Sequence, residues 1–221
     1  MTELKQRTQG RVLLLELAGE THGDANPLDS GLREQLTDAW SHLDENDDLR
    51  VAVLAGSGGA FSRGQAPDDV RRGIAAAWEL NAFPLHTSKP VIAAVEGVCH
   101  GGGFELALAC DLRIAAEGSS FGFPDLDAPG PFRVASVLLP RITFAGLSQE
   151  LLMSAKTLDS TRAYQARLIN RVVKEGEALQ TAVAIAEALA NKFGAADFKK
   201  QRILRMSGVP VVTAMSMARD S

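Results

Sequence analysis

Short runs of apolar residues that do not alternate with polar ones recur along the first half of the chain. They are Val12–Ala18, Val51–Ala55, Val91–Val95 and Leu112–Ala115. A strand that is apolar on both faces is typical of a parallel sheet covered by helices on each side. Between the first two runs, one helical face is formed by Leu32, Leu36, Trp40 and Leu43. The pattern therefore predicts an α/β fold with parallel pairing.

The second half of the chain has a different pattern. Pro124, Pro129, Pro131 and Pro140 predict an irregular segment, after which the pattern is mainly helical apart from a short strand at Arg171–Val173. A helix is also expected from about Pro67 to Leu80. We expect residues 1–175 to form an α/β core that carries the site, and residues 176–221 to form a helical C-terminal region packed on it.

Composition excludes several classes of protein. The 23 Lys and Arg against 27 Asp and Glu give a net charge of -4, which attracts neither nucleic acid nor an anionic membrane. The apolar run after the polar residues Met1–Gln9 is short and contains Glu16, so we expect no export signal and no membrane span. Cys99 and Cys110 are the only cysteines, which suits a reducing cytoplasm rather than a disulfide framework.

Basic residues concentrate in one place only, at Lys199, Lys200, Arg202 and Arg205. This stretch has a helical pattern. Charge runs on helices usually serve solubility, so we favour a solvated helix face over a binding site.

One hydrolase motif is present in the sequence, but the residues around it do not fit the structure that the motif requires. Gly118, Ser120 and Gly122 fit the G-x-S-x-G turn of hydrolases, which requires a helix directly after the serine. Pro124 and Pro129 deny it that helix. The hydrolase order also requires a histidine after the serine, and all four histidines precede it.

Nucleotide and metal sites find no support either. The loop from Gly56 to Gly64 lacks the third glycine of the dinucleotide fingerprint, having Phe61 in its place, and no Walker lysine follows it. The spacing of Cys99, His100, Cys110 and Asp111 matches no zinc pattern. We therefore expect no NAD, no nucleoside triphosphate and no metal.

The strongest candidate for chemistry is Gly101–Glu105, at the start of a helix that follows a buried strand. Glycines let a substrate approach the backbone closely, and free amides at a helix N-terminus favour developing negative charge. Glu105 lies one turn into the same helix, where a base is needed beside an oxyanion hole. The same residues also fit close helix packing around a buried, hydrogen-bonded glutamate, and spacing alone does not separate the two interpretations.

At this point the sequence resembles the crotonase superfamily, the enoyl-CoA hydratases and isomerases. The most specific matches are Lys89–Gly97, Gly101–Asp111 and Phe121–Asp125, and further matches are Asn26–Leu28, Gly59–Gly64 and Leu168–Val173. The resemblance covers roughly residues 10 to 190.

The resemblance implies a crotonase-like spiral of ββα units with a helical C-terminal region, assembled as trimers or pairs of trimers. The substrates would be acyl-CoA thioesters, with no cofactor other than the coenzyme A of the substrate. The oxyanion-hole amides would be those of Gln65 and Gly102, and the catalytic carboxylates Glu105 and Asp125 would hold the water that adds across the double bond. The expected substrate-binding neighbours are Arg63, Ala66, Gly101 and Gly103.

The chain departs from the family pattern at the site. Asp125 is a methylene shorter than the usual Glu, and a displacement of about 1 Å can cost about 100-fold in rate. Pro129–Arg133 replaces a stretch that is rich in glycine in many relatives, so we expect a reshaped acyl pocket. Asp24 and Ala25 stand where relatives often carry basic residues for the CoA phosphates, and Arg63 or the Lys199–Arg205 cluster would then have to supply that charge.

A further departure is that the sequence stops at Ser221, before helices that in relatives help to close the site and build the trimer. We therefore expect a shorter C-terminal region and a homo-oligomer that is weaker or differently packed.

Three functions remain open at this stage. The first is an enoyl-CoA hydratase or a double-bond isomerase. The second is a crotonase-like enzyme whose thioester is carried on an acyl carrier protein. The third is a catalytically silent subunit that keeps the fold, and the presence of both Glu105 and Gly102 argues against it.

Overall fold

The computed structural model describes residues 2–19, 25–66, 68–69, 82–124 and 133–192. Within them, the larger of two sheets has the strand order β1-β2-β3-β4-β6-β9. Its strands are β1 (Glu3–Gln9), β2 (Val12–Ala18), β3 (Val51–Gly56), β4 (Val91–Val95), β6 (Leu112–Ala116) and β9 (Arg171–Val173). Of these strands, only β1 is antiparallel to its neighbour. The predicted parallel sheet is confirmed, with each of the four apolar strands within one residue of its expected bounds.

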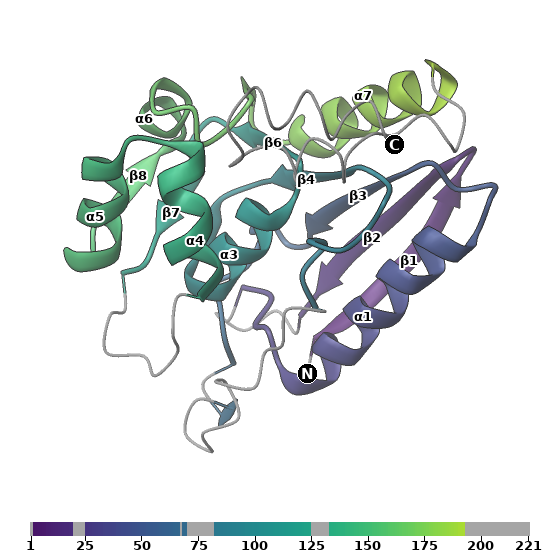
Figure 1. The fold of residues 1–221 in the computed structure, drawn as a ribbon, viewed down its shortest axis with the longest axis horizontal. Coiled ribbons are helices and arrows are strands. Elements are labelled where there is room, and N and C mark those ends of the chain that lie inside the picture. Colours follow the sequence, from purple (N-terminus) through teal and green to yellow (C-terminus); the bar gives the residue numbers. More distant parts are fainter. Residues whose placement is uncertain (1, 20–24, 67, 70–81, 125–132, 193–221) are drawn as a thin grey trace, which may run out of the picture.

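Helices cover this sheet on both faces, which is why its inner strands β2, β3, β4 and β6 are mainly apolar (Figure 1). Leu13 and Leu15 of β2 pack in the core that contains α1 (Ser30–Glu45), and Val12 and Leu14 pack on the other side with α7 (Ala178–Lys192). Successive side chains of a strand point to opposite faces, so one apolar strand supplies both cores. The predicted face of α1 is confirmed and is buried.

A second, smaller sheet lies beside the first and carries the remaining helices (Figure 1). Its strands are β5 (Val98–His100), β7 (Ser120–Gly122) and β8 (Thr157–Asp159), of which β5 and β7 are parallel and β8 is antiparallel to β7. The helices of this part are α3 (Gly101–Ala109), α4 (Arg133–Ile142), α5 (Ala145–Met153) and α6 (Ser160–Gln165). Because α3 packs on α4 and follows β5 directly, this corner of the molecule positions the candidate site.

The strand β1 has no counterpart among the sequence predictions. Leu4 is its only buried residue, so it lacks the apolar pattern that predicts β2, β3, β4 and β6. It pairs with β2 through a tight turn at Gly10, whose φ of 57° favours glycine. An edge strand that exposes polar side chains avoids pairing with other chains, and this explains its composition.

The prediction of an irregular segment is wrong for residues 133–142, which form α4 with Pro140 inside the helix. Pro140 lies two residues before the helix ends, so its missing amide removes a hydrogen bond only near the C-terminus. The predicted helix from 67 to 80 lies outside the described residues except for Asp68 and Asp69, which are helical. The division of the chain at residue 175 stays a prediction.

The described part of the chain contains no helix that is both long and apolar enough to cross a membrane.

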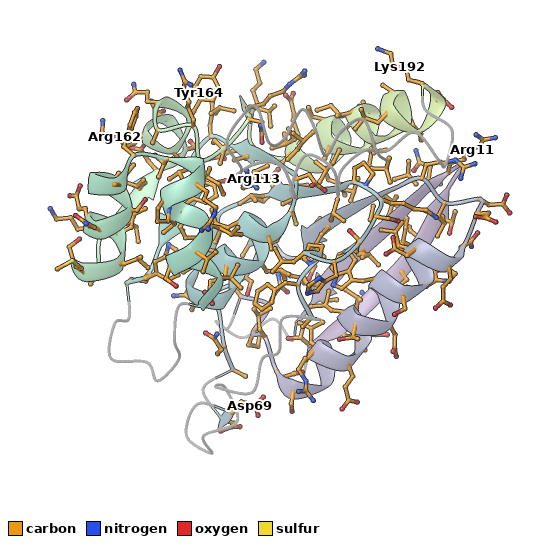
Figure 2. The ribbon with its side chains drawn as sticks, in the orientation of Figure 1. Arg11, Asp69, Arg113, Arg162, Tyr164 and Lys192 are labelled. Atoms are coloured by element: carbon orange, nitrogen blue, oxygen red, sulfur yellow. The ribbon has the colours of Figure 1, made fainter. Side chains whose placement is uncertain are left out.

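A buried cation, Arg113, fixes the far end of α3 (Figure 2). Its Nη1 donates to the carbonyl oxygens of Ala107, Leu108 and Cys110, and its Nε donates to that of Leu168 over 2.7 Å. The last carbonyls of a helix have no partner within the helix, so this guanidinium satisfies them and ties α3 to the segment before β9.

We expect Arg113→Met to lower the free energy of unfolding by about 3 kcal/mol, because these buried carbonyl oxygens then lose their hydrogen-bond donor. Urea unfolding followed by circular dichroism measures the change. Arg141→Met is the matched control, since Arg141 is exposed and donates to a carbonyl of its own helix; its effect should stay within about 0.5 kcal/mol. Equal losses in the two variants would contradict this role for Arg113.

Candidate active site

The first turn of α3 is held against the loop that ends at Gln65 by backbone hydrogen bonds. The amide of Ser62 donates to the carbonyl of Val98 over 3.0 Å, and the amide of His100 donates to the carbonyl of Ser62 over 2.9 Å. These bonds align residues 61–63 with β5, so the residues that follow each segment, Gly64 and Gly101, meet at the same place.

Glycines allow these two segments to touch. A Cβ on Gly103 would lie 2.6 Å from the Cβ of Ser62, and one on Gly64 would lie 3.1 Å from the amide nitrogen of Gly102. Gly64 and Gly101 also have φ values of 107° and 52°, which side chains rarely adopt. The backbones can approach this closely only because side chains are absent, and the predicted site residues Gly101, Gly102 and Gly103 lie together here.

The loop is also clamped from the N-terminal side by Asn26. Its Nδ2 donates to the carbonyls of Ser57, Ala60 and Phe61 over 3.0, 2.8 and 3.2 Å. In the sequence Asn26 is noted only as part of the family match Asn26–Leu28, and this role could not be predicted because the acceptors are backbone groups far along the chain.

Gln65 lies directly over Gly102. The amide of Leu28 donates to the carbonyl of Gly64, and the amide of Ala66 donates to the carbonyl of Leu28. In such a parallel bridge the amide of Gln65 itself points away from Leu28. The Gln65 side chain reaches α3, where a Cβ on Gly102 would lie 2.7 Å from its Nε2. The sequence assigned a role only to the backbone of Gln65, so this side chain is a new element of the site.

Glu105 is buried, with 4% of its surface exposed, one turn into α3. Its Oε1 accepts hydrogen bonds from the amides of Val134 and Ala135 over 2.9 and 3.0 Å. These amides belong to the first turn of α4, whose dipole favours a carboxylate. Among the described residues both hydrogen bonds fall on Oε1 and none falls on Oε2. No sequence signal indicates this contact, because the prolines around residue 130 argue against a helix there.

Burial dominates the acidity of this carboxyl group. It raises the pKa of Glu105 to about 7, although the hydrogen bonds from Ala135 and Val134 act in the opposite direction. A group with such a pKa exchanges protons readily near neutral pH, as a general acid or base must.

Aromatic rings line the inner side of α3. The ring centroid of Phe104 lies 5.8 Å from that of Phe121 and 5.4 Å from that of Phe123. Phe121 and Phe123 lie in and just after β7, which leads towards Asp125. Asp125 lies outside the described residues, and its pairing with Glu105 stays a prediction.

The remaining predicted residues fall into two groups. Arg63 is exposed and Ala66 is buried, and both lie next to the Gly64–Gln65 corner. Asp24, Pro129 to Phe132 and the Lys199–Arg205 cluster lie outside the described residues.

His100 ends β5 beside this corner. Its Nε2 lies 2.9 Å from Oγ of Ser120. Burial and the nearby Arg63 lower the pKa of His100, which favours the neutral ring.

The cysteines fit a structural role. Cys99 and Cys110 are buried at the two ends of α3, and each contacts a helix carbonyl through its sulfur. Burial raises the pKa of Cys99 well above its ordinary value, so its thiol stays protonated.

The comparisons with known proteins agree with this geometry. Residues 8–206 match the family model described as Enoyl-CoA hydratase/isomerase, and the chain belongs to that family. It is a crotonase-type enzyme of the class that acts on CoA thioesters.

Relatives and solved structures support the same assignment. Carnitinyl-CoA dehydratase of Salmonella typhi is 33% identical over 185 residues, which cover 76% of this chain and 67% of that protein. The crystal structure of an enoyl-CoA hydratase from Mycobacterium tuberculosis H37Rv has a TM-score of 0.90 at 30% identity, over 99% of this chain and 88% of that one. Pseudomonas aeruginosa DspI has a TM-score of 0.88 at 26% identity, over 98% and 92% of the two chains. The predicted crotonase fold is therefore confirmed.

The raised pKa of Glu105 predicts a pH-dependent stability. The folded protein binds this proton more tightly than the unfolded chain, whose ordinary pKa is 4.5. The resulting stabilisation is complete below about pH 4.5 and is lost as the pH rises to about 7. We expect the free energy of unfolding, relative to that of Glu105→Gln, to fall by up to about 3 kcal/mol over this range.

Urea unfolding at a series of pH values measures that difference. The amide side chain of Glu105→Gln keeps an oxygen that can accept the two α4 amides, so the comparison isolates the proton. Glu34→Gln is the control, because the side chain of Glu34 is 76% exposed. A difference between wild type and Glu105→Gln that stays constant with pH would show that burial does not raise this pKa.

Proposed function

We propose that this chain adds water across the double bond of an enoyl thioester. Glu105 exchanges the proton of the attacking water, and the amides of Gln65 and Gly102 stabilise the enolate that forms at the thioester carbonyl. The observation that supports this most strongly is the buried Glu105 carboxylate, with one oxygen held by α4, a single turn from Gly102.

The held carboxylate suits this role for a physical reason. Hydrogen bonds to Oε1 fix the rotamer of Glu105 before substrate binds, so no reorganisation is needed in the transition state. A pKa of about 7 lets the same group take a proton from water and return it in the reverse reaction. Asp125 would place the second proton, on the α-carbon of the substrate.

The names of the relatives favour water chemistry over isomerisation. Relatives are called carnitinyl-CoA dehydratase, and solved structures of similar chains are called enoyl-CoA hydratases. Removal and addition of water are the two directions of one reaction and use the same groups. An isomerase is the alternative, because Asp125 is shorter than the glutamate that a hydratase usually carries and one base is enough to move a double bond.

The carrier of the thioester is proposed to be coenzyme A. Arg63 is exposed next to Gly64 and is the described basic residue best placed to meet its phosphates. An acyl carrier protein is the alternative carrier, and competition by free coenzyme A separates the two. On the resemblance alone we also propose a homo-oligomer, a trimer or hexamer, that works in the cytoplasm.

Gly102→Val should abolish turnover while the circular dichroism spectrum stays unchanged. Its side chain would meet the Gln65 amide and fill the space in front of the Gly102 amide, and removal of one oxyanion donor costs about 100- to 1000-fold in rate. Gly146→Val is the matched control, because Gly146 also lies in a helix and nothing surrounds its Cβ position. Full activity of Gly102→Val on an enoyl-CoA would remove the oxyanion assignment.

Replacing each carboxylate separates hydration from isomerisation. Hydration needs both groups, so Glu105→Gln and Asp125→Asn should each lower kcat for water addition by about 100-fold or more. Loss of enoyl absorbance in a panel of enoyl-CoAs measures this rate. Glu150→Gln, an exposed change on α5, controls for unspecific effects.

A different result would support the isomerase. If the wild-type protein adds no water to any enoyl thioester but shifts a 3-enoyl double bond, and Asp125→Asn still does so, the hydratase proposal is wrong and the isomerase stands.

A further inference from the structure

The side chain of Gln65 is a polar group at the candidate site that the proposed function does not use. It is half-buried, and neither its Nε2 nor its Oε1 forms a hydrogen bond with a described residue. Solvent reaches both atoms, since the only fully enclosed side-chain nitrogen or oxygen without a partner in the described part of the chain is Nε of Arg50. The carboxamide therefore offers two N–H donors and one carbonyl acceptor to a molecule that enters the site.

This carboxamide lies against the first turn of α3. A Cβ on Gly102 would lie 2.7, 2.9 and 3.1 Å from Nε2, Cδ and Oε1 of Gln65, and a Cβ on Gly101 would lie 3.8 Å from the same Oε1. The Cα–Cβ bond of a helical residue tilts towards the helix N-terminus, which is also the end from which the unpaired amides point. The Gln65 carboxamide and the amide of Gly102 therefore meet at the same end of α3.

The backbone amides at this corner are available as well. Within the residues that the structure describes, the amides of Gln65 and Gly102 donate to no acceptor outside α3, whereas the amide of Ala66 donates to the carbonyl of Leu28 over 3.0 Å. Gln65 and Gly102 thus carry three unpaired groups that can donate, namely two backbone amides and one carboxamide.

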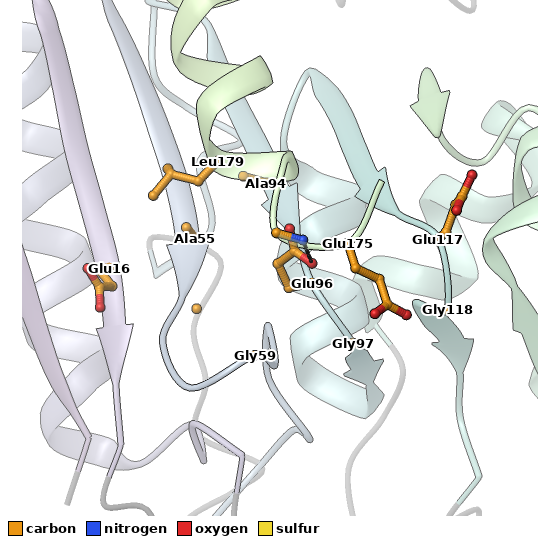
Figure 3. A pocket seen from close by; sticks show the side chains of 12 residues that line it. Glu16, Ala55, Gly59, Ala94, Glu96, Gly97, Glu117, Gly118, Glu175 and Leu179 are labelled. Carbon is orange, nitrogen blue, oxygen red and sulfur yellow. Dashed lines mark hydrogen bonds between the residues drawn. The ribbon is translucent and has the colours of Figure 1, made fainter. Parts of the chain in front are cut away.

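The carboxamide lies on the α3 side of its loop and away from the cavity behind it. That cavity has a volume of about 540 Å³ and lies at the carboxyl ends of β3, β4 and β6 (Figure 3). Gly59 of the same loop lines it together with Gly97, but neither Gln65 nor Gly102 does. A molecule that contacts the Gln65 side chain is therefore one that binds at the start of α3.

We propose that Nε2 of Gln65 is a third donor to the thioester oxygen of the substrate, beside the amides of Gln65 and Gly102. This inference rests on the proposed function. As water adds, its oxygen bonds to the β-carbon and one of its protons passes to Glu105. The electrons of the carbon–carbon double bond form a new double bond to the thioester carbon, and the carbonyl electrons move onto oxygen. The enolate later takes a proton at the α-carbon.

The third donor stabilises the enolate more than the substrate. A negative oxygen accepts a stronger hydrogen bond than a neutral carbonyl oxygen does, so the Nε2 bond strengthens as the reaction proceeds. An interaction that is stronger in the transition state than in the bound substrate raises the rate.

Substrate binding also favours donation over a passive role for this side chain. A thioester whose oxygen lies at the amide of Gly102 covers the carboxamide that rests on Gly102 and removes it from water. A buried N–H group without an acceptor is costly, and the substrate oxygen is the acceptor at this place.

Binding of acetoacetyl-CoA tests the donor without turnover. This thioester loses a proton to solvent from the carbon between its two carbonyl groups, and the enolate is measured by its ultraviolet absorbance. Gln65→Met keeps the length of the side chain and removes the donor. We expect it to lower the ratio of bound enolate to bound keto form by about 10- to 100-fold at a fixed pH.

Two further variants frame this result. Gln65→Glu should lower the enolate ratio more than Gln65→Met, because a carboxylate repels the enolate. Gln149→Met is the matched control, since Gln149 is exposed on α5, and it should leave the ratio unchanged.

Kinetics separate a donor from a packing contact. A donor to the enolate changes kcat, so Gln65→Met should lower kcat for water addition by about 10- to 100-fold and leave KM within about twofold. The temperature of unfolding should stay within about 2 °C of the wild type, because the side chain has no hydrogen bond in the free protein.

The contact with Gly102 provides a double-mutant test. Gly102→Ala keeps the backbone amide, but its Cβ would displace the Gln65 carboxamide. The losses of enolate ratio in Gly102→Ala and Gln65→Met should therefore not add in the double variant. Losses that add would contradict the contact on which the third donor depends.

An enolate ratio that is unchanged in Gln65→Met would overturn the proposal. A higher ratio would also overturn it, because it would show that the carboxamide blocks the site. Hydratases and isomerases both pass through this enolate, so the binding test holds for either reaction. A wild-type protein that stabilises the enolate but adds no water to any enoyl thioester would contradict the hydratase proposal alone.

Discussion

The close packing of two backbone segments, residues 62–65 against residues 100–103, is the constraint on which the candidate site depends. The hydrogen bonds between Ser62 and β5 set their register, and the glycines on both sides remove the side chains that would hold them apart. The amide of Gly102 and the corner at Gln65 are therefore placed by parts of the fold that carry no chemistry. The proposed oxyanion hole requires such a rigid backbone, because hydrogen-bond donors that must move during the reaction stabilise the transition state less.

The second requirement of the candidate site is a carboxylate that is buried and can still exchange a proton. Burial of Glu105 without partners would be costly, and the first turn of α4 offsets this cost with two amides and the helix dipole. Because these bonds compensate only in part, the pKa remains raised, to about 7. The same arrangement thus stabilises the fold around α3 and leaves a proton that moves near neutral pH.

The sequence predicts most of the fold and part of the site for identifiable reasons. Strands that are buried on both faces, such as Val91–Val95, appear in the sequence as continuous apolar runs. The edge strand Glu3–Gln9 is polar and shows no such run, since it forms by pairing with β2. Gly102 and Glu105 are candidates because of their position at a helix start, and their roles stay predictions. The contact of Glu105 with the amides of Val134 and Ala135 could not be predicted, because every residue type except proline supplies an amide.

The cavity at the carboxyl ends of β3, β4 and β6 and the corner at Gln65 share one loop. Gly59 and Gly97 line the cavity, and a side chain on Gly97 would collide with the carbonyl of Gly59, so the loop and the start of β5 are in backbone contact there as well. The same loop continues through Ser62 to Gln65. The hydrogen bonds of Asn26 and those between Ser62 and β5 hold this loop, so the same contacts fix the cavity wall at Gly59 and the corner at Gln65.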